Sequence, residues 1–468
     1  MFSKFPTPYW SAPSAALYVG DVRECLKKIP ARSVHCVITS PPYWGLRDYG
    51  TGTWEGGSAE CDHMEKTAEQ KHKSSTLGTS AIQRKIGGGK ILPATNAAYK
   101  SLARQYVGQC LKCGACRTDQ QLGNEPLSDC GTYGQSQCGS CFVCSMVSVF
   151  RSVYRVLRDD GTLWLNLGDT FDNGQSMIPA LVALALRKDE WKLVQDIIWY
   201  SPNKMPESVT SRCSKAHEHI FLMAKTDDYY FDSIVIQEEG KSGPLPRLLA
   251  NGEGVDKTKA KGGKQQAGST GFVNKRDVWI VPTQGYPGTH YATFSPKLIT
   301  PCIQAGTSEH GVCGECGRQY ERLVVKRDGA SIFHGGTKGT PPGQNPQSDQ
   351  RDDTRDRSFA WSRNGKPGTG LTLDGIPLTK ETIGWQKMCG CHSSVVSAPI
   401  VLDPFVGSGT TVATALELGR AGIGIDLSQT YIDENAIPRI NSVSSGIPVP
   451  RNTVAVPSAT RPAPRRLD

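Results

Sequence analysis

The fold is set by residues 400–411, which read Ile400-Val401-Leu402-Asp403-Pro404-Phe405-Val406-Gly407-Ser408-Gly409-Thr410-Thr411. The apolar start predicts a buried strand, and residues 411–418 have the pattern of a helix. Ile423-Gly424-Ile425 is predicted to be the next strand, and it ends at Asp426. A strand, a glycine turn, a helix and a second strand are the repeating parts of an open parallel α/β sheet, so we expect that fold.

The turn between this strand and its helix has the features of a nucleoside site. Gly407 and Gly409 let a ligand approach the backbone closely, and Asp426 lies where an acid would accept both ribose hydroxyls. The turn lacks the third glycine of a dinucleotide-binding fingerprint and the Gly-Lys-Ser/Thr of a phosphate-binding loop. Asp403 would repel a phosphate and could bind an amine, which fits the amino-acid end of S-adenosylmethionine. The alternative interpretation is a glycine turn without a ligand in an ordinary doubly wound sheet.

A second motif, Thr39-Ser40-Pro41-Pro42-Tyr43, directly follows the strand predicted at 34–38. Consecutive prolines have no N–H and are held extended, so the Pro41 carbonyl is left as a free acceptor. Ser40 and Pro41 could accept hydrogen bonds from the exocyclic amine of a base and direct its lone pair at a methyl group, while Tyr43 stacks on the base. A base in a duplex must be flipped out to reach such a pocket. The alternative interpretation is a Pro-Pro turn at the end of a strand.

Taken together, the two motifs resemble those of the amino-methylating DNA methyltransferases of bacteria and phages, in the permuted, β-type group whose catalytic motif precedes the cofactor motif. Gly20-Asp21 resembles the acidic position that contacts the adenine of the cofactor, and residues 290–296 resemble the segment before the cofactor loop. The resemblance implies the Rossmann-like sheet of an S-adenosylmethionine-dependent methyltransferase, with the catalytic and cofactor strands side by side. The catalytic residues that it implies are Ser40, Pro41, Pro42 and Tyr43. The cofactor-binding residues that it implies are Asp21, Asp403, Phe405, Gly407, Ser408, Gly409, Thr410 and Asp426.

The first position of the catalytic tetrapeptide indicates which amine is methylated. In the family that the motifs resemble, serine at this position usually accompanies the N4 amine of cytosine, whereas Asp or Asn usually accompanies the N6 amine of adenine. Ser40 therefore predicts a site-specific cytosine-N4 methyltransferase that acts on double-stranded DNA, with the adenine N6 amine as the alternative. The sequence is compatible both with a cognate restriction endonuclease as partner and with a solitary phage enzyme.

The sixteen cysteines indicate metal binding rather than disulfides, because the chain has no predicted export signal and the reducing cytosol keeps thiols free. Cys313-x-x-Cys316 and Cys389-Gly-Cys391 form two close pairs, which is the pattern of a structural zinc site with four thiolates. An earlier segment is richer, and its preferred zinc ligands are Cys61, His63, Cys110 and Cys113. The other cysteines of that segment, which could supply a second ion, are Cys116, Cys130, Cys138, Cys141 and Cys144. Spacing alone leaves their grouping open.

The two cysteine-rich segments interrupt the predicted core as zinc-binding insertions. The expected organisation is the catalytic-motif part of the core at 1–50, a zinc-binding insertion at 51–145, more of the core at 146–231, a target-recognition region at 232–285, core at 286–310, a second zinc-binding insertion with a mobile loop at 311–394, the cofactor-binding part of the core at 395–440, and a disordered tail at 441–468. A net charge of +9 suits a polyanionic partner. The first residues lack an apolar run with a cleavage site, and the longest apolar stretch is too short for a bilayer. We therefore expect a cytoplasmic protein of a bacterial cell or a phage-infected host.

Three other classes of protein share single features with the chain. A zinc-dependent base deaminase would explain His63-x-Glu65 with a later Cys-x-x-Cys, but Gln109 stands where its signature has proline. A covalent C5 methyltransferase would use Pro301-Cys302, which instead lies in a predicted helix. A zinc-containing DNA-binding protein without catalysis would explain the cysteines and the charge, but neither the glycine turn nor the catalytic loop. Equilibrium binding of S-adenosylmethionine would separate this last class from an enzyme.

Overall fold

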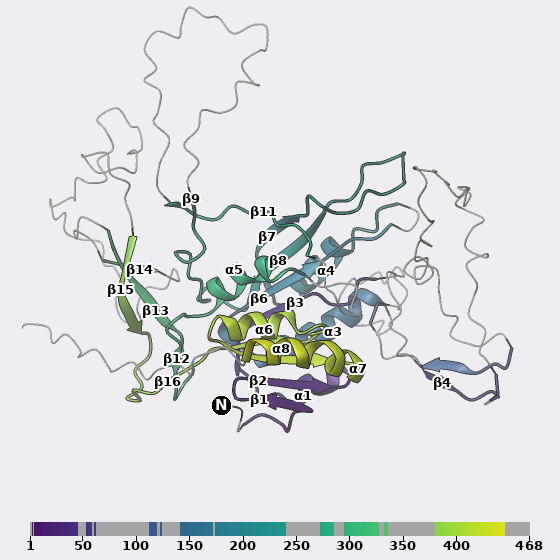
Figure 1. Ribbon diagram of the computed structural model, residues 1–468, viewed down its shortest axis with the longest axis horizontal. Helices are drawn as coiled ribbons and strands as arrows, with labels where there is room; N and C mark the ends of the chain where they lie inside the picture. Colours follow the sequence, from purple (N-terminus) through teal and green to yellow (C-terminus); the bar gives the residue numbers. More distant parts are fainter. Residues whose placement is uncertain are drawn as a thin grey trace, which may run out of the picture.

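The computed structural model describes residues 2, 4–44, 53–58, 60–61, 112–118, 122–123, 141–171, 174–239, 272–284, 294–326, 332–335 and 380–444, and its centre is a nine-stranded sheet (Figure 1). In spatial order the strands are β1 (Trp10–Ala12), β2 (Ala15–Val19), β18 (Ala421–Asp426), β17 (Ile400–Asp403), β3 (Val34–Thr39), β6 (Leu157–Leu167), β8 (His217–Ala224), β7 (Lys192–Tyr200) and β11 (Val278–Ile280). The neighbouring strands β2, β18, β17, β3 and β6 are parallel to one another. β1 is antiparallel to β2, and β8 is antiparallel to both of its neighbours. The predicted open α/β sheet is confirmed, but β1 and β8 make it mixed rather than wholly parallel.

The parallel strands at the centre are buried along their whole length. Every residue of β3 and every residue of β17 is buried, which is expected where helices cover both faces of a sheet. In β18, glycines leave room for the helix layer. A Cβ atom added at Gly422 would lie 2.7 Å from Val412 Cγ1, and one added at Gly424 would lie 2.6 Å from Val406 Cγ2. The glycine-rich pattern of β18 therefore allows the helix after the glycine turn to lie directly on the sheet.

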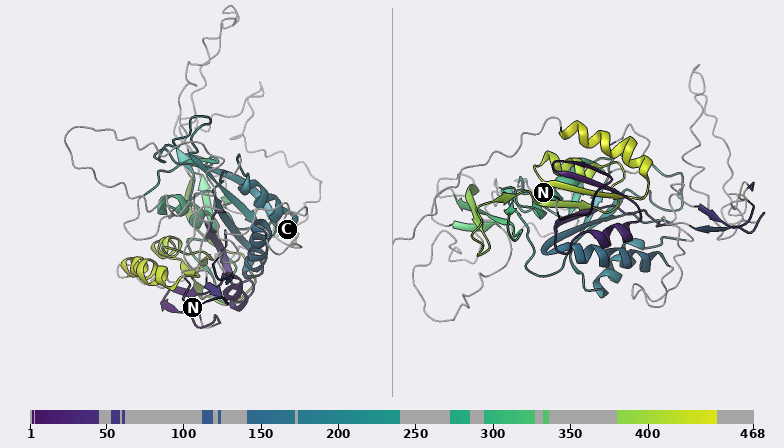
Figure 2. Two further views of the ribbon diagram at one scale, coloured as in Figure 1. Left: turned by 90° about the vertical axis from the view of Figure 1, so that its right-hand side faces the viewer. Right: turned by 90° about the horizontal axis from the view of Figure 1, so that it is seen from below.

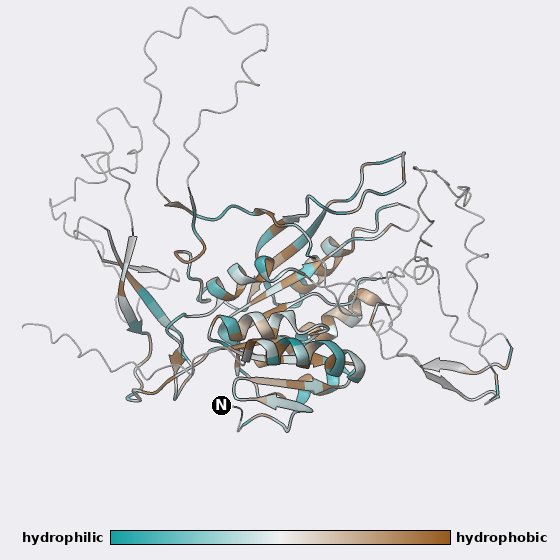
Figure 3. Ribbon diagram, in the orientation of Figure 1, coloured by the Kyte–Doolittle hydropathy of each residue, from teal (hydrophilic) through white to brown (hydrophobic). Residues whose placement is uncertain are grey.

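Helices cover the sheet on two sides (Figure 2). One face carries α1 (Val22–Lys28), α3 (Phe142–Val156) and α4 (Ile178–Lys188), and the other carries α5 (Pro296–Gly306), α6 (Thr410–Glu417) and α8 (Ile437–Ser444). α7 (Gln429–Tyr431) and the π-helix η6 (Ile432–Ala436) lead into α8. Successive residues of β3 serve opposite layers, because Val37 packs with the first set of helices and Cys36 and Ile38 pack with the second. Figure 3 shows the resulting apolar segments along the central strands.

The ends of the parallel strands place the predicted motifs at one edge of the sheet. Gly20 follows β2, Asp426 ends β18, Asp403 ends β17 and Ser40 follows β3. β8 runs in the opposite direction, so its first residues lie at this same edge. β17 pairs directly with β3. The strands that carry the cofactor loop and the catalytic loop are therefore side by side, as predicted.

Smaller sheets lie outside the central one. β13 (Tyr320–Lys326) pairs with both β14 (Ile332–Gly335) and β15 (Lys380–Lys387), and the two-stranded sheets are β12 (Val312–Cys313) with β16 (Val396–Ser397), β9 (Glu238–Glu239) with β10 (Phe272–Val273), and β4 (Thr53–Glu55) with β5 (Cys116–Thr118). Most of the predicted first insertion, recognition region and tail lies outside the described residues. Among the helices that the structure does describe, none is long and apolar enough to cross a membrane.

Two element boundaries differ from the sequence pattern. Asp159-Asp160-Gly161 predicts a turn, whereas these residues lie inside β6. Pairing between Val34 and Leu157 starts the strand earlier, and Arg158 balances the buried Asp160 carboxylate at 2.8 Å. Similarly, α3 begins within the residues expected to form the first insertion.

Candidate active site

Asp403 joins the two predicted loops. The Thr39 hydroxyl donates to its Oδ1 at 2.7 Å, and the Phe405 amide donates to the same oxygen at 3.0 Å. Its Oδ2 accepts a hydrogen bond from the Thr411 hydroxyl at 2.6 Å. Asp403 is only 2% exposed, and burial, partly offset by the bonds from Thr411 and Thr39, raises the pKa of this carboxyl to about 6. The carboxylate therefore connects the last residue of β3 to the glycine turn and to α6.

The glycine turn uses backbone conformations that other residues rarely adopt. Gly407 has φ 47° and Gly409 has φ 77°, which is the left-handed region. A Cβ atom at Gly409 would lie 2.9 Å from the Cα of Ala436, so the turn also packs closely against η6. Ser408 and Thr410 are buried, and the Arg439 guanidinium contacts both hydroxyls, with 3.0 Å to Ser408 Oγ. Four of the predicted cofactor-binding residues thus form one rigid turn.

Asp426, the predicted ribose acid, lies beside this turn. Its Oδ2 accepts a hydrogen bond from the Gly407 amide at 2.9 Å, and its Oδ1 accepts one from the Ser428 amide at 2.8 Å. Burial raises the pKa of Asp426 to about 6. The side chain keeps some solvent exposure, and the backbone amides of Gly407, Ser428 and Leu427 all donate to it. A carboxylate offers about four acceptor positions, so this one retains capacity for a ligand hydroxyl.

Asp21 reaches the same edge of the sheet from β2. Its Oδ1 accepts a hydrogen bond from the Arg23 amide at 2.7 Å, which caps α1, and it also forms an ion pair with the Arg23 guanidinium. Burial opposes ionisation, but these bonds from Arg23 outweigh it and lower the pKa of Asp21. The amide of Gly20 donates to the Asp426 carbonyl at 2.9 Å, so the ends of β2 and β18 are tied together. Gly20 has φ 141°, which favours glycine at this position.

The predicted catalytic loop is held through Tyr43. The Ser40 hydroxyl donates to Tyr43 Oη at 3.0 Å, and Tyr43 Oη donates to Glu218 Oε2 at 2.7 Å. The ring lies on the backbone of Gly168, because a Cβ atom there would be 2.5 Å from Tyr43 Cε2. The loop between Ser40 and Tyr43 therefore closes over the end of β6.

Asn166 and Glu218 belong to this site, although the sequence did not single them out as site residues. Asn166 Nδ2 donates to Tyr43 Oη at 2.8 Å and to Glu218 Oε2 at 3.1 Å. Lys204 lies 3.3 Å from the other oxygen of Glu218. Asn166 is near the end of β6 and Glu218 is near the start of β8. The apolar run 219–224 predicts a strand that begins directly after Glu218, but the direction of that strand is needed to place Glu218 here.

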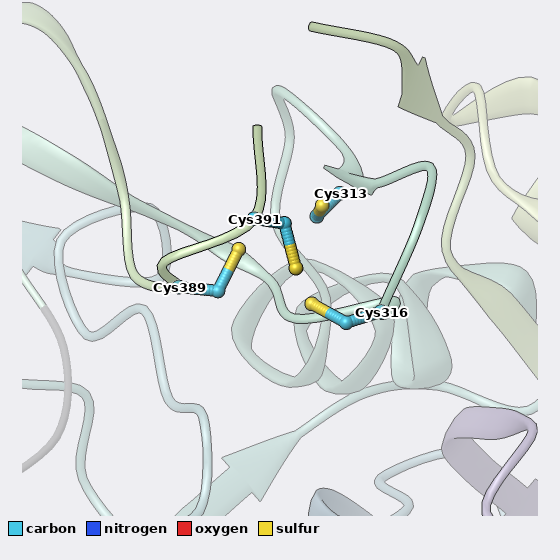
Figure 4. A group of neighbouring side chains, drawn as sticks. All are labelled: Cys313, Cys316, Cys389 and Cys391. Carbon is cyan, nitrogen blue, oxygen red and sulfur yellow. The ribbon is translucent and has the colours of Figure 1, made fainter. Parts of the chain in front are cut away.

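The late cysteine pairs are brought together. The sulfur atoms of Cys313, Cys316, Cys389 and Cys391 all lie within 4.8 Å of one another, and Figure 4 shows the four side chains converging from two loops. Of the preferred earlier ligands, His63 and Cys110 lie outside the described residues, as do Cys130 and Cys138. Cys61 and Cys113 are described and half-buried. The earlier grouping therefore stays a prediction.

The alternative cysteine nucleophile is buried inside a helix. Cys302 lies inside α5, is 1% exposed, and its thiol contacts the Leu298 carbonyl oxygen at 3.7 Å. Burial holds its pKa well above the ordinary value, so the thiolate is disfavoured. Residues 290–293 and the His63-x-Glu65 motif lie outside the described residues.

Comparison with known proteins adds independent matches. The family model N6_N4_Mtase, described as DNA methylase, matches residues 34–314 and 393–437. The Type II methyltransferase M.Cfr9I of Citrobacter freundii is 29% identical over 323 residues, covering 63% of this chain and 73% of that protein. The Type II methyltransferase M.SfiI of Streptomyces fimbriatus is 27% identical over 464 residues, covering 91% and 90%. Among solved structures, the PvuII DNA methyltransferase (cytosine-N4-specific) aligns over 96% of this chain and 99% of that chain, with 13% identity and a TM-score of 0.42.

Proposed function

The chain belongs to the N6/N4 DNA methylase family, and from this premise we propose that it transfers a methyl group from S-adenosylmethionine to the exocyclic N4 amine of cytosine in double-stranded DNA. The observation that carries the proposal is the Thr39–Asp403 hydrogen bond. It connects the strand that carries Ser40-Pro41-Pro42-Tyr43 to the glycine turn. The same chemistry on the N6 amine of adenine is the alternative.

The residues of the turn fit the proposed cofactor. Asp426 keeps some solvent exposure and acceptor capacity for the ribose hydroxyls, while Gly407 and Gly409 keep the turn free of side-chain bulk beyond the backbone. Asp21 is proposed to face the adenine. Both oxygens of Asp403 already accept hydrogen bonds from the chain, so we assign its charge, rather than a new bond, to attracting the cationic methionine end. S-adenosylmethionine supplies a methyl group that its sulfonium has already activated.

The catalytic loop is proposed to hold the target amine. The Ser40 hydroxyl donates to Tyr43, and its oxygen accepts from Asn166 Nδ2 at 3.5 Å, which leaves one oxygen lone pair to accept from the amine. The Pro41 carbonyl is a second acceptor. Prolines have no N–H, so neither Pro41 nor Pro42 offers a backbone donor that would compete with the amine for this oxygen. Together the two acceptors would bring the nitrogen lone pair towards the methyl group. Asn166 and Glu218 are positioning residues in this proposal, because they hold the Tyr43 phenol against which the flipped base would stack.

Cytosine is preferred over adenine because Ser40 occupies the first position of the tetrapeptide. Among the described residues of the site, none distinguishes cytosine from adenine by the size of the base. The choice between the two amines therefore depends on this one residue and on the residues of the recognition region.

DNA recognition is proposed to involve residues 232–285, of which 232–239 and 272–284 are described. Lys275 and Arg276 lie just before the edge strand β11. Cations at this position would contact phosphates and orient the duplex without specifying its sequence. A cognate restriction endonuclease in the same bacterial cytoplasm would fit a protein similar to Type II methyltransferases.

Transfer of tritium-labelled methyl groups to DNA tests the proposal. Purified full-length protein with labelled S-adenosylmethionine should label double-stranded DNA, and Ser40→Ala should lower the rate by roughly 100-fold or more, as losing a transition-state hydrogen bond does elsewhere. Ser152→Ala is the matched control, because Ser152 lies half-buried on α3 and its hydroxyl bonds back to the Ser148 carbonyl, and it should keep full activity. Equal rates for Ser40→Ala and the control would contradict the proposed role of the loop.

A further inference from the structure

The four late cysteines form a site with the geometry of a metal centre. Cys313 ends β12, Cys316 lies in the turn after it, and Cys389 and Cys391 follow β15. Tetrahedral zinc with bonds of about 2.3 Å separates its sulfur ligands by about 3.8 Å. The observed sulfur atoms all lie within 4.8 Å of one another, so a small contraction would close the shell (Figure 4).

Hydrogen bonds to backbone groups hold both turns that carry these thiols. The Gly317 amide donates to the Cys313 carbonyl at 2.8 Å, and Gly317 has φ 74°, which favours glycine directly after the second cysteine. On the other side, Lys387 Nζ donates to the carbonyls of Cys391 and Ser393. The Gly314 amide donates to the Val395 carbonyl at 2.8 Å and joins the two turns. The thiols are therefore held together before any ion binds.

Apolar packing does not explain these cysteines. Cys316 is exposed, and Cys389 and Cys391 are only partly buried, whereas Cys36 and Cys302 are buried in the core. Cys313 is buried beside these three. Four gathered thiols, two of them in a Cys-x-x-Cys-Gly turn, are the usual ligands of structural zinc.

We propose that Cys313, Cys316, Cys389 and Cys391 bind one structural zinc ion, which fastens the sheet β14-β13-β15 to the starting edge of the central sheet. The carbonyl of Cys316 accepts from Arg158 Nη1 at 2.9 Å, and the carbonyl of Gly317 accepts from His35 Nε2 at 3.0 Å. The other ring nitrogen of His35 accepts from the Ile400 amide at 3.0 Å. The zinc turn is thus bonded to β6 and β3, and through His35 to β17. This inference does not depend on the proposed methyl transfer.

The ion is remote from the chemistry. His35 is the second residue of β3, and Ser40 follows the end of that strand. Five residues of extended strand span about 17 Å. A site with four thiolates also leaves no open position for substrate. Zinc therefore stabilises the fold from the edge opposite the catalytic loop.

Metal content of the full-length protein tests the assignment. Inductively coupled plasma mass spectrometry should find one zinc ion fewer per chain in Cys316→Ser than in the wild type, and thermal unfolding should occur at a lower temperature. Cys213→Ser is the matched control, because Cys213 is exposed and unbonded to another cysteine, and it should change neither value. Comparing variants isolates this site even if the earlier cysteines bind a further ion. Unchanged zinc in Cys316→Ser, or iron in its place, would overturn the proposal.

Alkylation of the wild-type protein provides a test that needs no variant. In native protein, Cys213 should react with iodoacetamide at once, whereas the four proposed ligands should react only after a chelator has removed zinc. Peptide mass spectrometry assigns each modified thiol. Immediate reaction of all four, or their recovery as disulfides, would rule out a zinc site.

Discussion

Replacing Thr39 with valine should weaken the junction between the catalytic and cofactor strands. Thr39 is fully buried, and its hydroxyl is the direct side-chain link from β3 to Asp403, at 2.7 Å. Backbone pairing between β3 and β17 is short, with Cα partners only at Cys36 and Val37 on the β3 side. Valine keeps the shape of threonine but removes the donor. The Asp403 carboxylate would then keep only its bonds to Phe405 and Thr411.

The expected loss follows from the charge of the acceptor. A hydrogen bond to a buried charged group contributes about 2 kcal/mol, and one to a neutral group contributes about 1 kcal/mol. Asp403 has a pKa of about 6 in the folded chain, above its ordinary value of 3.8. The folded state is therefore favoured by this group at low pH, and that stabilisation is lost as the pH rises through 6. We expect Thr39→Val to lower the free energy of unfolding by about 2 kcal/mol at pH 8 and by about 1 kcal/mol at pH 5.

Urea denaturation followed by tryptophan fluorescence at the two pH values measures this difference. Thr414→Val is the matched control, because Thr414 is also buried but donates to the Thr410 carbonyl within α6. Such back-bonding adds little to stability, so the control should change by less than about 0.5 kcal/mol. An equal loss of unfolding free energy at pH 5 and pH 8 would mean that the effect comes from packing alone. No loss in Thr39→Val would contradict the role given to the Thr39–Asp403 bond.

Three further results are expected at the site. Tyr43→Ala should bind S-adenosylmethionine as the wild type does but lose most methyl transfer, because the Tyr43 ring stacks on the target base and not on the cofactor. Calorimetry measures the binding and a transfer assay measures the activity, and full activity would mean that the base does not stack on Tyr43. Glu218→Ala should lower the transfer rate about tenfold, which corresponds to one lost charge-assisted hydrogen bond. Glu218→Gln should keep most of the rate, because its amide oxygen still accepts from Tyr43. Equal losses in both variants would mean that the charge of Glu218 matters instead. Cofactor affinity should fall by at least about tenfold per pH unit below 6, because protonated Asp426 accepts ribose hydroxyls poorly and Asp403 loses its charge over the same range. Asp426→Asn should bind weakly and depend less on pH, since only Asp403 still titrates, and a wild-type affinity that is flat between pH 5 and 7.5 would exclude the role of Asp426.

The turn that carries the proposed cofactor site could be predicted from the sequence because its signals are local. Asp403, Gly407, Gly409 and Asp426 lie within one strand, turn, helix and strand unit, so their spacing places them together before any long-range pairing is known. Helix α5 was predicted for the same reason, and the structure confirms it at Pro296–Gly306.

The other parts of the site depend on pairing between distant segments. Glu218 reaches Tyr43 only because β8 runs antiparallel to β6, and the apolar pattern of a strand does not encode its direction. The Thr39–Asp403 bond joins residues 364 positions apart in the chain. The turn expected at 159–161 was wrong because those residues lie inside β6, whose ladder with β3 pairs at Leu157, is irregular over 158–161 and resumes at Thr162. Tertiary contacts overrode the local turn signal there.

The identity of the methylated base is the decisive observation. Double-stranded DNA should be incubated with the purified chain and S-adenosylmethionine, digested to nucleosides and analysed by mass spectrometry against standards. The arrangement of Ser40, Pro41 and Tyr43 beside the Asp403 turn predicts N4-methylcytosine. N6-methyladenine alone would overturn the choice of base while keeping the amine chemistry. 5-Methylcytosine, or no modified nucleoside although the chain binds S-adenosylmethionine and DNA, would contradict direct methyl transfer to an amine at this site.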